Sequence, residues 1–198
     1  MSLRYAMLSA LLDGEATGYE LAKRFDSSIS NFWHALPQQL YQELGRMEDD
    51  GLVAGEAVVQ TGRPNKRIFS ITDDGRGALA AWLEEPYRLH GMKEEFLIKM
   101  YSSDLAAPDD VIRFLEAYIA PHEEKLRLYE SMRDLMFHGR DEAQFIRTTH
   151  RIGPYLALKR GLIYERENID WARWTIEAMR ERIASGAHPP HGAIGIRR

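Results

Sequence analysis

The sequence contains no cysteine, so disulfide bonds, thiolate metal sites, cysteine nucleophiles and thiol-based redox sensing are excluded. It also lacks an uninterrupted apolar run of about 18 residues, the length that a membrane-spanning helix needs. The apolar stretch near the start ends at Asp13 and Glu15, and no cleavage pattern of small residues follows it. These absences predict a soluble, cytoplasmic protein without a membrane segment.

An excess of positive charge is missing too. The chain of 198 residues carries 26 Lys or Arg and 30 Asp or Glu, a formal net charge of -4. Residues 1–85 hold eight basic and thirteen acidic side chains, whereas residues 86–198 hold eighteen and seventeen. This balance argues against a protein that coats nucleic acid along its whole length. A nucleic-acid site in the first half would have to be a local basic patch.

Patterns of catalytic and metal-binding residues are absent as well. The sequence shows no Ser/His/Asp arrangement, no phosphate-binding glycine loop and no metal-ligand spacing, and its seven histidines are scattered. We therefore expect neither an enzyme nor a protein that holds a metal or another cofactor. With 44% hydrophobic and 28% charged residues, the chain is typical of a folded protein with a packed core.

The first 85 residues contain an ordered series of three helices, a hairpin and a fourth helix. Thr17 and Glu20 form a T-x-x-E capping box, Pro37 suits the first turn of the third helix, and Thr72 caps the fourth. Gly, Pro and Asn between the two strands mark the hairpin turn. This order is typical of a winged helix-turn-helix, which places one helix in the DNA major groove. The elements are expected at residues 3–12, 18–26, 37–50, 52–60, 67–71 and 73–83.

The third helix is the candidate reading helix. Its apolar stripe of Leu40, Leu44 and Met47 predicts that the opposite side is exposed, although no Ser, Thr or Asp directly precedes the helix to cap it. Glutamine can form two hydrogen bonds with adenine and arginine can do the same with guanine. Polar residues on a helix are also often simply solvated. The candidate DNA contacts on this helix are Gln38, Gln39, Tyr41, Gln42 and Arg46.

The hairpin carries the densest basic cluster of the first half. Such a cluster can contact DNA phosphates, but a charged turn can equally be exposed without a partner. Two further basic side chains on the second helix could contact phosphates or pair with Glu20 or Asp26. The candidates are Arg63, Lys66 and Arg67 in the hairpin and Lys23 and Arg24 on the second helix.

The chain beyond a connector at residues 84–92 is mostly helical. Pro108 begins a long helix that reaches about Phe137, and Pro121 is expected to kink or split it. Residues 155–185 form a second long helix with a heptad seam that is apolar apart from Glu165. The seam predicts self-association, although it could instead pack on the first long helix of the same chain. Its apolar members are Leu158, Leu162, Ile169, Ala172, Ile176, Met179 and Ile183.

Aromatic residues lie beside this seam in the sequence. Trp171 and Trp174 are one turn apart, and with Phe96, Tyr101 and Tyr118 they could line a pocket for a planar effector. The alternative, which we favour, is ordinary packing in the core or in an interface.

Five ordered blocks in the first half resemble the successive blocks of PadR-type transcriptional regulators. They are Thr17–Leu21, Leu40–Leu44, Glu48–Val53, Gly62–Pro64 and Ser70–Gly75. Residues 93–101 resemble the linker helix of the long PadR subgroup, and residues 158–165 resemble the start of its final helix. Together the resemblance spans roughly residues 1–183.

This resemblance implies a homodimeric repressor that binds an operator through its N-terminal winged helix and dimerises through its C-terminal helices. Many members of the family are released from DNA by a small molecule. The chain departs from the family at Gln38–Gln39, where Ser or His is expected. Carried onto this sequence, the implied DNA contacts are Gln39, Tyr41 and Gln42 in the third helix, Arg63 and Lys66 in the wing, and Tyr19 to the DNA backbone.

We therefore predict a mainly α-helical protein with a β wing. Residues 1–85 form a winged helix-turn-helix DNA-binding domain, residues 86–185 a helical dimerisation and effector domain, and residues 186–198 a Gly/Pro-rich tail. The predicted function is a sequence-specific regulator whose partners are operator DNA, a second copy of the chain and a small-molecule effector. A winged-helix module that docks on other proteins is the alternative, and the net acidity of the first half favours it slightly.

Overall fold

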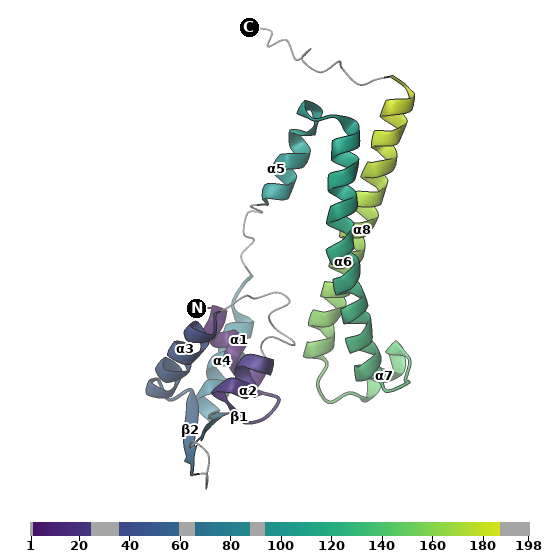
Figure 1. Cartoon of the computed structure of the whole chain (residues 1–198). Helices are drawn as coiled ribbons and strands as arrows, with labels where there is room; N and C mark the ends of the chain where they lie inside the picture. The colour runs from purple at the N-terminus through teal and green to yellow at the C-terminus, as the bar shows by residue number, and fades with distance from the viewer. Residues whose placement is uncertain (1, 25–35, 60–65, 88–93, 187–198) are drawn as a thin grey trace. The chain divides into compact units, whose positions relative to one another are not determined.

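The computed structural model describes residues 2–24, 36–59, 66–87 and 94–186 (Figure 1). The chain divides into two compact units, Met1–Leu89 and His90–Arg198, which we call the winged unit and the helical unit. Within the described residues, no helix is long and apolar enough to cross a membrane. Arg63 and most of the tail lie outside the described residues.

The winged unit contains helices around a small three-stranded sheet (Figure 1). The strand order is β1-β3-β2 and both neighbouring pairs are antiparallel, with Val53 opposite Ile71 and Ala16 opposite Phe69. The expected helices and hairpin are present, whereas the two-residue strand β1 is too short to leave a sequence pattern. The elements are α1 (Ser2–Leu11), β1 (Ala16–Thr17), α2 (Gly18–Arg24), α3 (Pro37–Asp49), β2 (Val53–Val58), β3 (Lys66–Ile71) and α4 (Asp73–Glu84).

Local hydrogen bonds fix where the helices of the winged unit begin. The Thr17 N–H donates to Glu20 Oε2 at 2.8 Å and the Glu20 N–H donates to Thr17 Oγ1 at 3.1 Å, which confirms the capping box. The Gly75 N–H donates to Thr72 Oγ1 at 3.0 Å at the start of α4. The helices and the sheet enclose one apolar core, whose fully buried members include Met7 and Leu44.

Two long helices make up most of the helical unit, and they lie side by side (Figure 1). The chain turns after α6 through His138 and Gly139, both with positive φ. The sequence predicts that Pro121 kinks or splits this segment, and the split is wrong, because the 30-residue helix α6 contains Pro121 in its interior. Proline removes only one backbone donor, and buried side chains on both sides of it hold α6 against α8. The elements are α5 (Glu95–Tyr101), η2 (Ser103–Leu105), α6 (Pro108–Phe137), α7 (Glu142–Thr148) and α8 (Gly153–Ala184).

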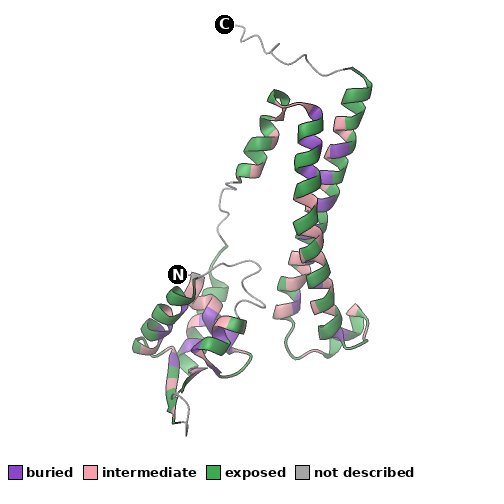
Figure 2. Ribbon diagram, in the orientation of Figure 1, coloured by how far each residue is buried: buried purple, intermediate pink, exposed green. Residues whose placement is uncertain are grey.

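The heptad seam of α8 is covered by α6 of the same chain. Leu162, Ile169, Ala172 and Ile176 are buried, and the last two share a core cluster with Val111, Ile112 and Leu115 of α6 (Figure 2). Leu158 and Met179 are half-buried and Ile183 is exposed. The structure therefore realises the alternative in which the seam packs within one chain. The four buried members of the seam are covered by α6, and the role of the seam in self-association stays a prediction.

Glu165, the polar member of the seam, is only 1% exposed and belongs to a polar cluster between α6 and α8. Its Oε2 lies 2.5 Å from His122 Nδ1, and its Oε1 lies 3.5 Å from Lys125 Nζ. The Tyr118 ring lies against the His122 ring, and its hydroxyl donates to Asn168 Oδ1 at 3.0 Å. Burial raises the pKa of Tyr118 to about 12, so the phenol keeps the proton that it donates.

Three ion pairs join the exposed edges of α6 and α8 at heptad intervals. The residue number on α8 rises by seven from pair to pair while that on α6 falls by seven, as antiparallel helices require. These pairs, which we call the charge ladder, are Arg166–Glu130 (2.7 Å), Arg173–Glu123 (2.6 Å) and Arg180–Glu116 (3.6 Å).

Candidate nucleic-acid interface

Helix α3 presents a polar face to solvent opposite a buried apolar stripe. Leu40, Leu44 and Met47 are buried in the core of the winged unit. The exposed face extends over about 12 Å, since each helical residue adds about 1.5 Å. That length spans roughly three to four base steps of a duplex. The exposed side chains include all five candidates of this helix, namely Gln38, Gln39, Tyr41, Gln42 and Arg46.

Gln39 has a structural task that the sequence pattern does not reveal. The Leu36 N–H donates to Gln39 Oε1 at 2.9 Å, so Gln39 caps the start of α3 from its third position. A bidentate bond to adenine uses both the oxygen and the nitrogen of a side-chain amide. With its oxygen occupied, Gln39 is poorly arranged for that bond. Gln42, one turn along the helix, has no hydrogen bond to any described residue, and it is the better candidate reader.

Tyr41 connects the two helices of the helix-turn-helix. Its ring lies against Gly18, the first residue of α2, so closely that a Cβ at Gly18 would come within 2.5 Å of the ring. Only glycine fits there without a shift. The Tyr41 ring therefore positions α3 against α2 and is still half exposed. Tyr19, the neighbour of Gly18, is also exposed, on the surface of the same unit.

The two basic candidates on α2 have different surroundings. Lys23 is exposed. Arg24 donates from Nη1 to the Gly14 carbonyl at 2.7 Å and from Nη2 to the Glu15 carbonyl at 3.0 Å. These bonds hold the loop before β1 against α2. Lys23 is therefore better placed than Arg24 to contact a phosphate.

The described part of the wing divides its basic residues between two tasks. Lys66 is exposed at the start of β3. The hydrogen bonds from Thr17 lower the pKa of Glu20 at the start of α2, and the charge of Lys66 lowers it further. Arg67 instead pairs with Glu48 of α3 at 2.5 Å and lies over the Phe69 ring. Arg67 thus fastens the wing to α3.

Acidic side chains around α3 are paired with cations of their own unit. Arg4 of α1 bonds Glu43 at 2.9 Å and Asp50 at 2.8 Å, and the bond to Glu43 raises the pKa of Arg4. Glu48 is paired with Arg67. Two arginines partly offset the charge of these three carboxylates, so the negative potential near the polar face is weaker than the carboxylates alone would produce.

The five aromatic candidates for an effector pocket are not brought together within one chain. Phe96 stacks on Tyr118 with ring centroids 4.1 Å apart and meets Trp171 edge-on at 5.4 Å. These three rings are packed against one another in the core of the helical unit. Tyr101 is 92% exposed and Trp174 is 68% exposed, so both lie outside that cluster.

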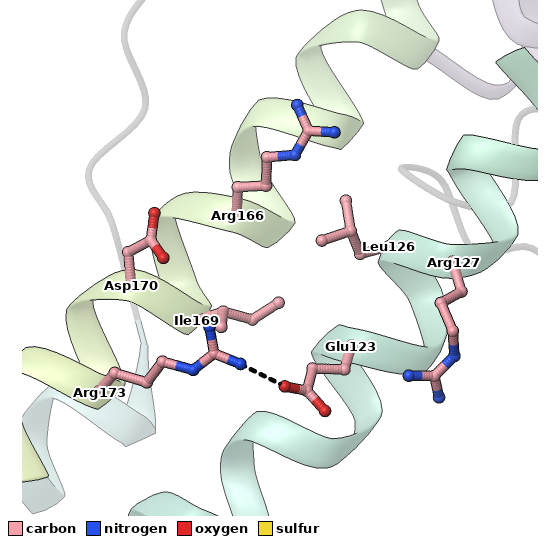
Figure 3. A pocket seen from close by; sticks show the side chains of 7 residues that line it. All are labelled: Glu123, Leu126, Arg127, Arg166, Ile169, Asp170 and Arg173. Atoms are coloured by element: carbon pink, nitrogen blue, oxygen red, sulfur yellow. Dashed lines mark hydrogen bonds and ion pairs between the residues drawn. The ribbon is translucent and has the colours of Figure 1, made fainter.

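A shallow hollow lies along the charge ladder, on the edge between α6 and α8 (Figure 3). Its volume is about 390 Å³. The side chains around it are mostly charged, and the dashed line in Figure 3 is the Glu123–Arg173 pair of the ladder. The lining residues are Glu123, Leu126, Arg127, Arg166, Ile169, Asp170 and Arg173.

Comparison with known proteins agrees with this arrangement. Residues 7–81 match the model of the "Transcriptional regulator PadR-like family", and residues 92–180 match the model "Virulence activator alpha C-term". The chain is 32% identical to the "Probable transcriptional regulator Rv1176c" of Mycobacterium tuberculosis over 92% of its own length and 100% of that protein. The chain belongs to the PadR-like family of transcriptional regulators.

Other relatives of this PadR-like protein include one from Bacillus subtilis and one from Vibrio cholerae. The "Negative transcriptional regulator PadR" of B. subtilis is 25% identical over 85% of this chain and 92% of that protein. Its crystal structure with operator DNA has a TM-score of 0.79 and covers 90% of this chain and 99% of that one, and its structure with p-coumaric acid has a TM-score of 0.74. The V. cholerae virulence activator AphA is 26% identical, with a TM-score of 0.66 and coverage of 90% and 98%.

One residue of the polar face of this PadR-like protein was not among the candidates. Gly45 lies on α3 between Gln42 and Arg46, is exposed, and has no heavy atom within 4 Å of the position its Cβ would take. The available signal was a glycine inside a helical pattern, which weakens the helix unless another requirement calls for it. The sequence does not show what surrounds Gly45. Only the structure shows that the space around it is open.

Proposed function

We propose that this protein binds a duplex operator through α3 and the wing, and that bound protein represses transcription. The observation that carries the proposal is the polar face of α3, which presents Gln42 and Arg46 outward while the acidic groups beside it are paired internally. Glutamine and arginine are the side chains that read adenine and guanine in the major groove. The exposed Lys23 and Lys66 supply positive charge for phosphates on the same unit.

The relatives support this proposal and its direction. The B. subtilis relative is named a negative regulator and has been crystallised with operator DNA, and its fold extends over nearly the whole of this chain. The relative from V. cholerae is named an activator. We favour repression because a winged helix on an operator blocks transcription without any further contact.

We also propose that the protein acts as a homodimer, through the outer side of α8. Leu156, Ile163 and Trp174 are exposed large apolar residues. They are seven and eleven residues apart, which places them on one line of the helix, opposite the face that packs on α6. An exposed apolar line on a long helix is typical of an interface between chains. Dimerisation would present two copies of α3 to an operator with two half-sites.

We further propose that a small molecule relieves operator binding. The structure of the B. subtilis relative with p-coumaric acid supports this idea for the family. The test is to add p-coumaric acid, and then other aromatic acids, to the complex of this protein with DNA. Release of DNA by one of these compounds, but not by a salt of equal ionic strength, is the expected result.

The DNA-binding proposal predicts a specific change in salt dependence. Replacing Arg63 and Lys66 with alanine should weaken binding to all sequences and reduce the slope of log Kd against log salt by about 2 for each bound protomer, and so by about 4 for a homodimer, since each phosphate contact contributes about 0.9. Fluorescence anisotropy with labelled duplexes at several salt concentrations measures both quantities. A matched control removes two cations of the helical unit, Arg113→Ala with Arg127→Ala, and should leave the slope unchanged.

The reading role of α3 has its own variant. Gln42→Ala should cost about 1–3 kcal/mol on the preferred duplex and little on a shuffled one. An equal loss on both duplexes would show that Gln42 is not a reader. If the unaltered protein binds no duplex with sequence preference at low salt, the docking module becomes the better description of the winged unit.

A further inference from the structure

Gly45 occupies an unusual place on the polar face of α3. It lies in the interior of the helix, four residues before its end, and it is exposed. A glycine at such a position destabilises a helix relative to alanine, because the unfolded chain loses more backbone freedom on folding. Helix stability therefore does not explain the glycine.

The winged unit itself supplies no such reason. A Cβ at Gly18 would strike the Tyr41 ring, and a Cβ at Gly75 would strike the Leu52 carbonyl oxygen, so packing requires glycine at both places. In α8, a Cβ at Gly161 would come within 2.8 Å of the Tyr129 ring. A Cβ at Gly45 meets nothing within 4 Å, and Gly45 does not have the positive φ that favours glycine.

The neighbours of Gly45 on the helix surface indicate what the open space is for. Gln42 lies three residues before it and Gln38 seven residues before it, and residues at these spacings lie on one side of a helix. Arg46 follows Gly45 directly and lies four residues after Gln42, so it borders the same side. Gly45 is thus a position without a side chain among side chains that can form hydrogen bonds. A surface that binds those side chains must pass directly over Gly45.

We propose that Gly45 is a fitting residue for DNA: the missing side chain lets α3 lie close enough in the groove for Gln42 and Arg46 to reach their partners. This inference rests on the proposed function and deepens it. A side chain here would begin with a carbon about 1.5 Å further out. Hydrogen bonds of 2.7–3.2 Å weaken steeply with such a displacement. Gly45 would therefore set affinity without contacting a base edge itself.

Gly77 of α4 is a matched control for the helix effect. It is also exposed, it lies inside a helix, and nothing is within 4 Å of its Cβ position. Its neighbours on the helix surface are mostly different, because Asp73, Asp74 and Glu84 are acidic and Ala80 is apolar, although the exposed Arg76 directly precedes it. Acidic residues outnumber the single basic one, so a side chain at Gly77 should not affect DNA binding.

The experiment compares Gly45→Ala, Gly45→Leu and Gly77→Ala in the full chain. The probe is a labelled duplex that the unaltered protein enriches from a random-sequence pool, and anisotropy measures Kd. Gly45→Ala should weaken binding by roughly tenfold and Gly45→Leu by more, while Gly77→Ala binds like the unaltered protein. Both alanine variants should raise Tm by about 1–4 °C, since alanine favours the helix by about 0.5–1 kcal/mol. Weaker binding by a more stable protein is a result that a purely structural role of Gly45 does not produce.

Two outcomes overturn the inference and are distinguishable. If the unaltered protein binds its duplex and Gly45→Leu binds it equally well, α3 does not approach DNA at Gly45, and the proposed function stands. If the unaltered protein enriches no duplex from the pool, the proposed function and the role of Gly45 fall together.

Discussion

The two units use ion pairs in different ways. In the winged unit, Arg4 joins α1 to both Glu43 and Asp50, and these pairs connect residues far apart in sequence at single, irregular points. In the helical unit, the charge ladder repeats the same Arg–Glu pair every seven residues along two helices. The first arrangement keeps acidic groups occupied beside a face meant for another molecule. The second aligns two helices with each other.

The two units also differ in which helix surfaces are left free to bind another molecule. The α8 seam is a regular apolar pattern, and its buried side chains pack against α6 of the same chain. The polar face of α3 has no regular internal partner and is left exposed. The apolar seam of α8 is thus covered within the chain, whereas the polar face of α3 is left for an external partner.

The largest expected effect separates the buried and outer sides of α8. Ile176 is 5% exposed, so Ile176→Lys buries an unpaired charge and should cost about 3–5 kcal/mol of unfolding free energy. Trp174→Lys is only two residues away but exposed, and it should change the stability of the fold by about 0.5 kcal/mol or less while dissociating the homodimer. Urea unfolding and sedimentation velocity measure the two quantities.

The same pair of variants tests where the dimer contact lies. Ile163→Lys, on the line of Trp174, should behave like Trp174→Lys. A folded, stable and monomeric Ile176→Lys protein would contradict the internal packing of the seam and return that residue to an interface between chains.

The next effect concerns the polar cluster in the helical unit. Glu165→Ala removes a buried carboxylate and leaves its partners His122 and Lys125 without it, at a cost of about 3 kcal/mol. Replacing both members of the closest pair with leucine, in His122→Leu with Glu165→Leu, should recover most of that loss. Urea unfolding of the single and double variants measures the difference. A double variant no more stable than Glu165→Ala would show that the pair contributes more than its burial costs.

The smallest effects compare single pairs of the two arrangements. Arg173→Ala removes one exposed rung of the charge ladder and should cost less than about 1 kcal/mol, with the loss shrinking at high salt. Arg4→Ala removes a bridge between two carboxylates and should cost about 1–2 kcal/mol, since it leaves Asp50 without this partner and leaves Glu43 with only the longer contact to Arg46 at 3.4 Å. Thermal unfolding at low and high salt measures both. Equal losses would remove the proposed distinction between the two units.

Much of the winged unit could be predicted from local sequence. Thr17 and Thr72 cap helices through contacts with residues three positions away, and such contacts leave a readable pattern. Gln39 shows the limit, because an exposed glutamine and a capping glutamine look alike until the preceding backbone is placed. The role of Arg67 was equally hidden, since its partner Glu48 is brought close only by the fold.

The helical unit shows a second limit. The heptad pattern of α8 correctly indicates a buried stripe. The pattern does not show which surface covers that stripe. Tyr101 and Trp174 were grouped with Phe96 by their aromatic character, and the structure exposes both. These two side chains point outward because of how α5 and α8 are rotated relative to α6. The spacing of residues within α5 or α8 does not reveal that rotation.

Glu165 gives the hairpin of α6 and α8 a unique alignment. A charge ladder that repeats every seven residues does not fix a single alignment of the two helices. If α8 slid by one heptad, Arg166 would still meet a glutamate, Glu123. The same slide would place the carboxylate of Glu165 opposite Leu115 instead of His122 and opposite Tyr118 instead of Lys125, so Glu165 would lose both basic partners. The ion pairs of the charge ladder alone would allow several alignments of α6 and α8. The buried carboxylate of Glu165 favours one of these alignments, because only there does it meet His122 and Lys125.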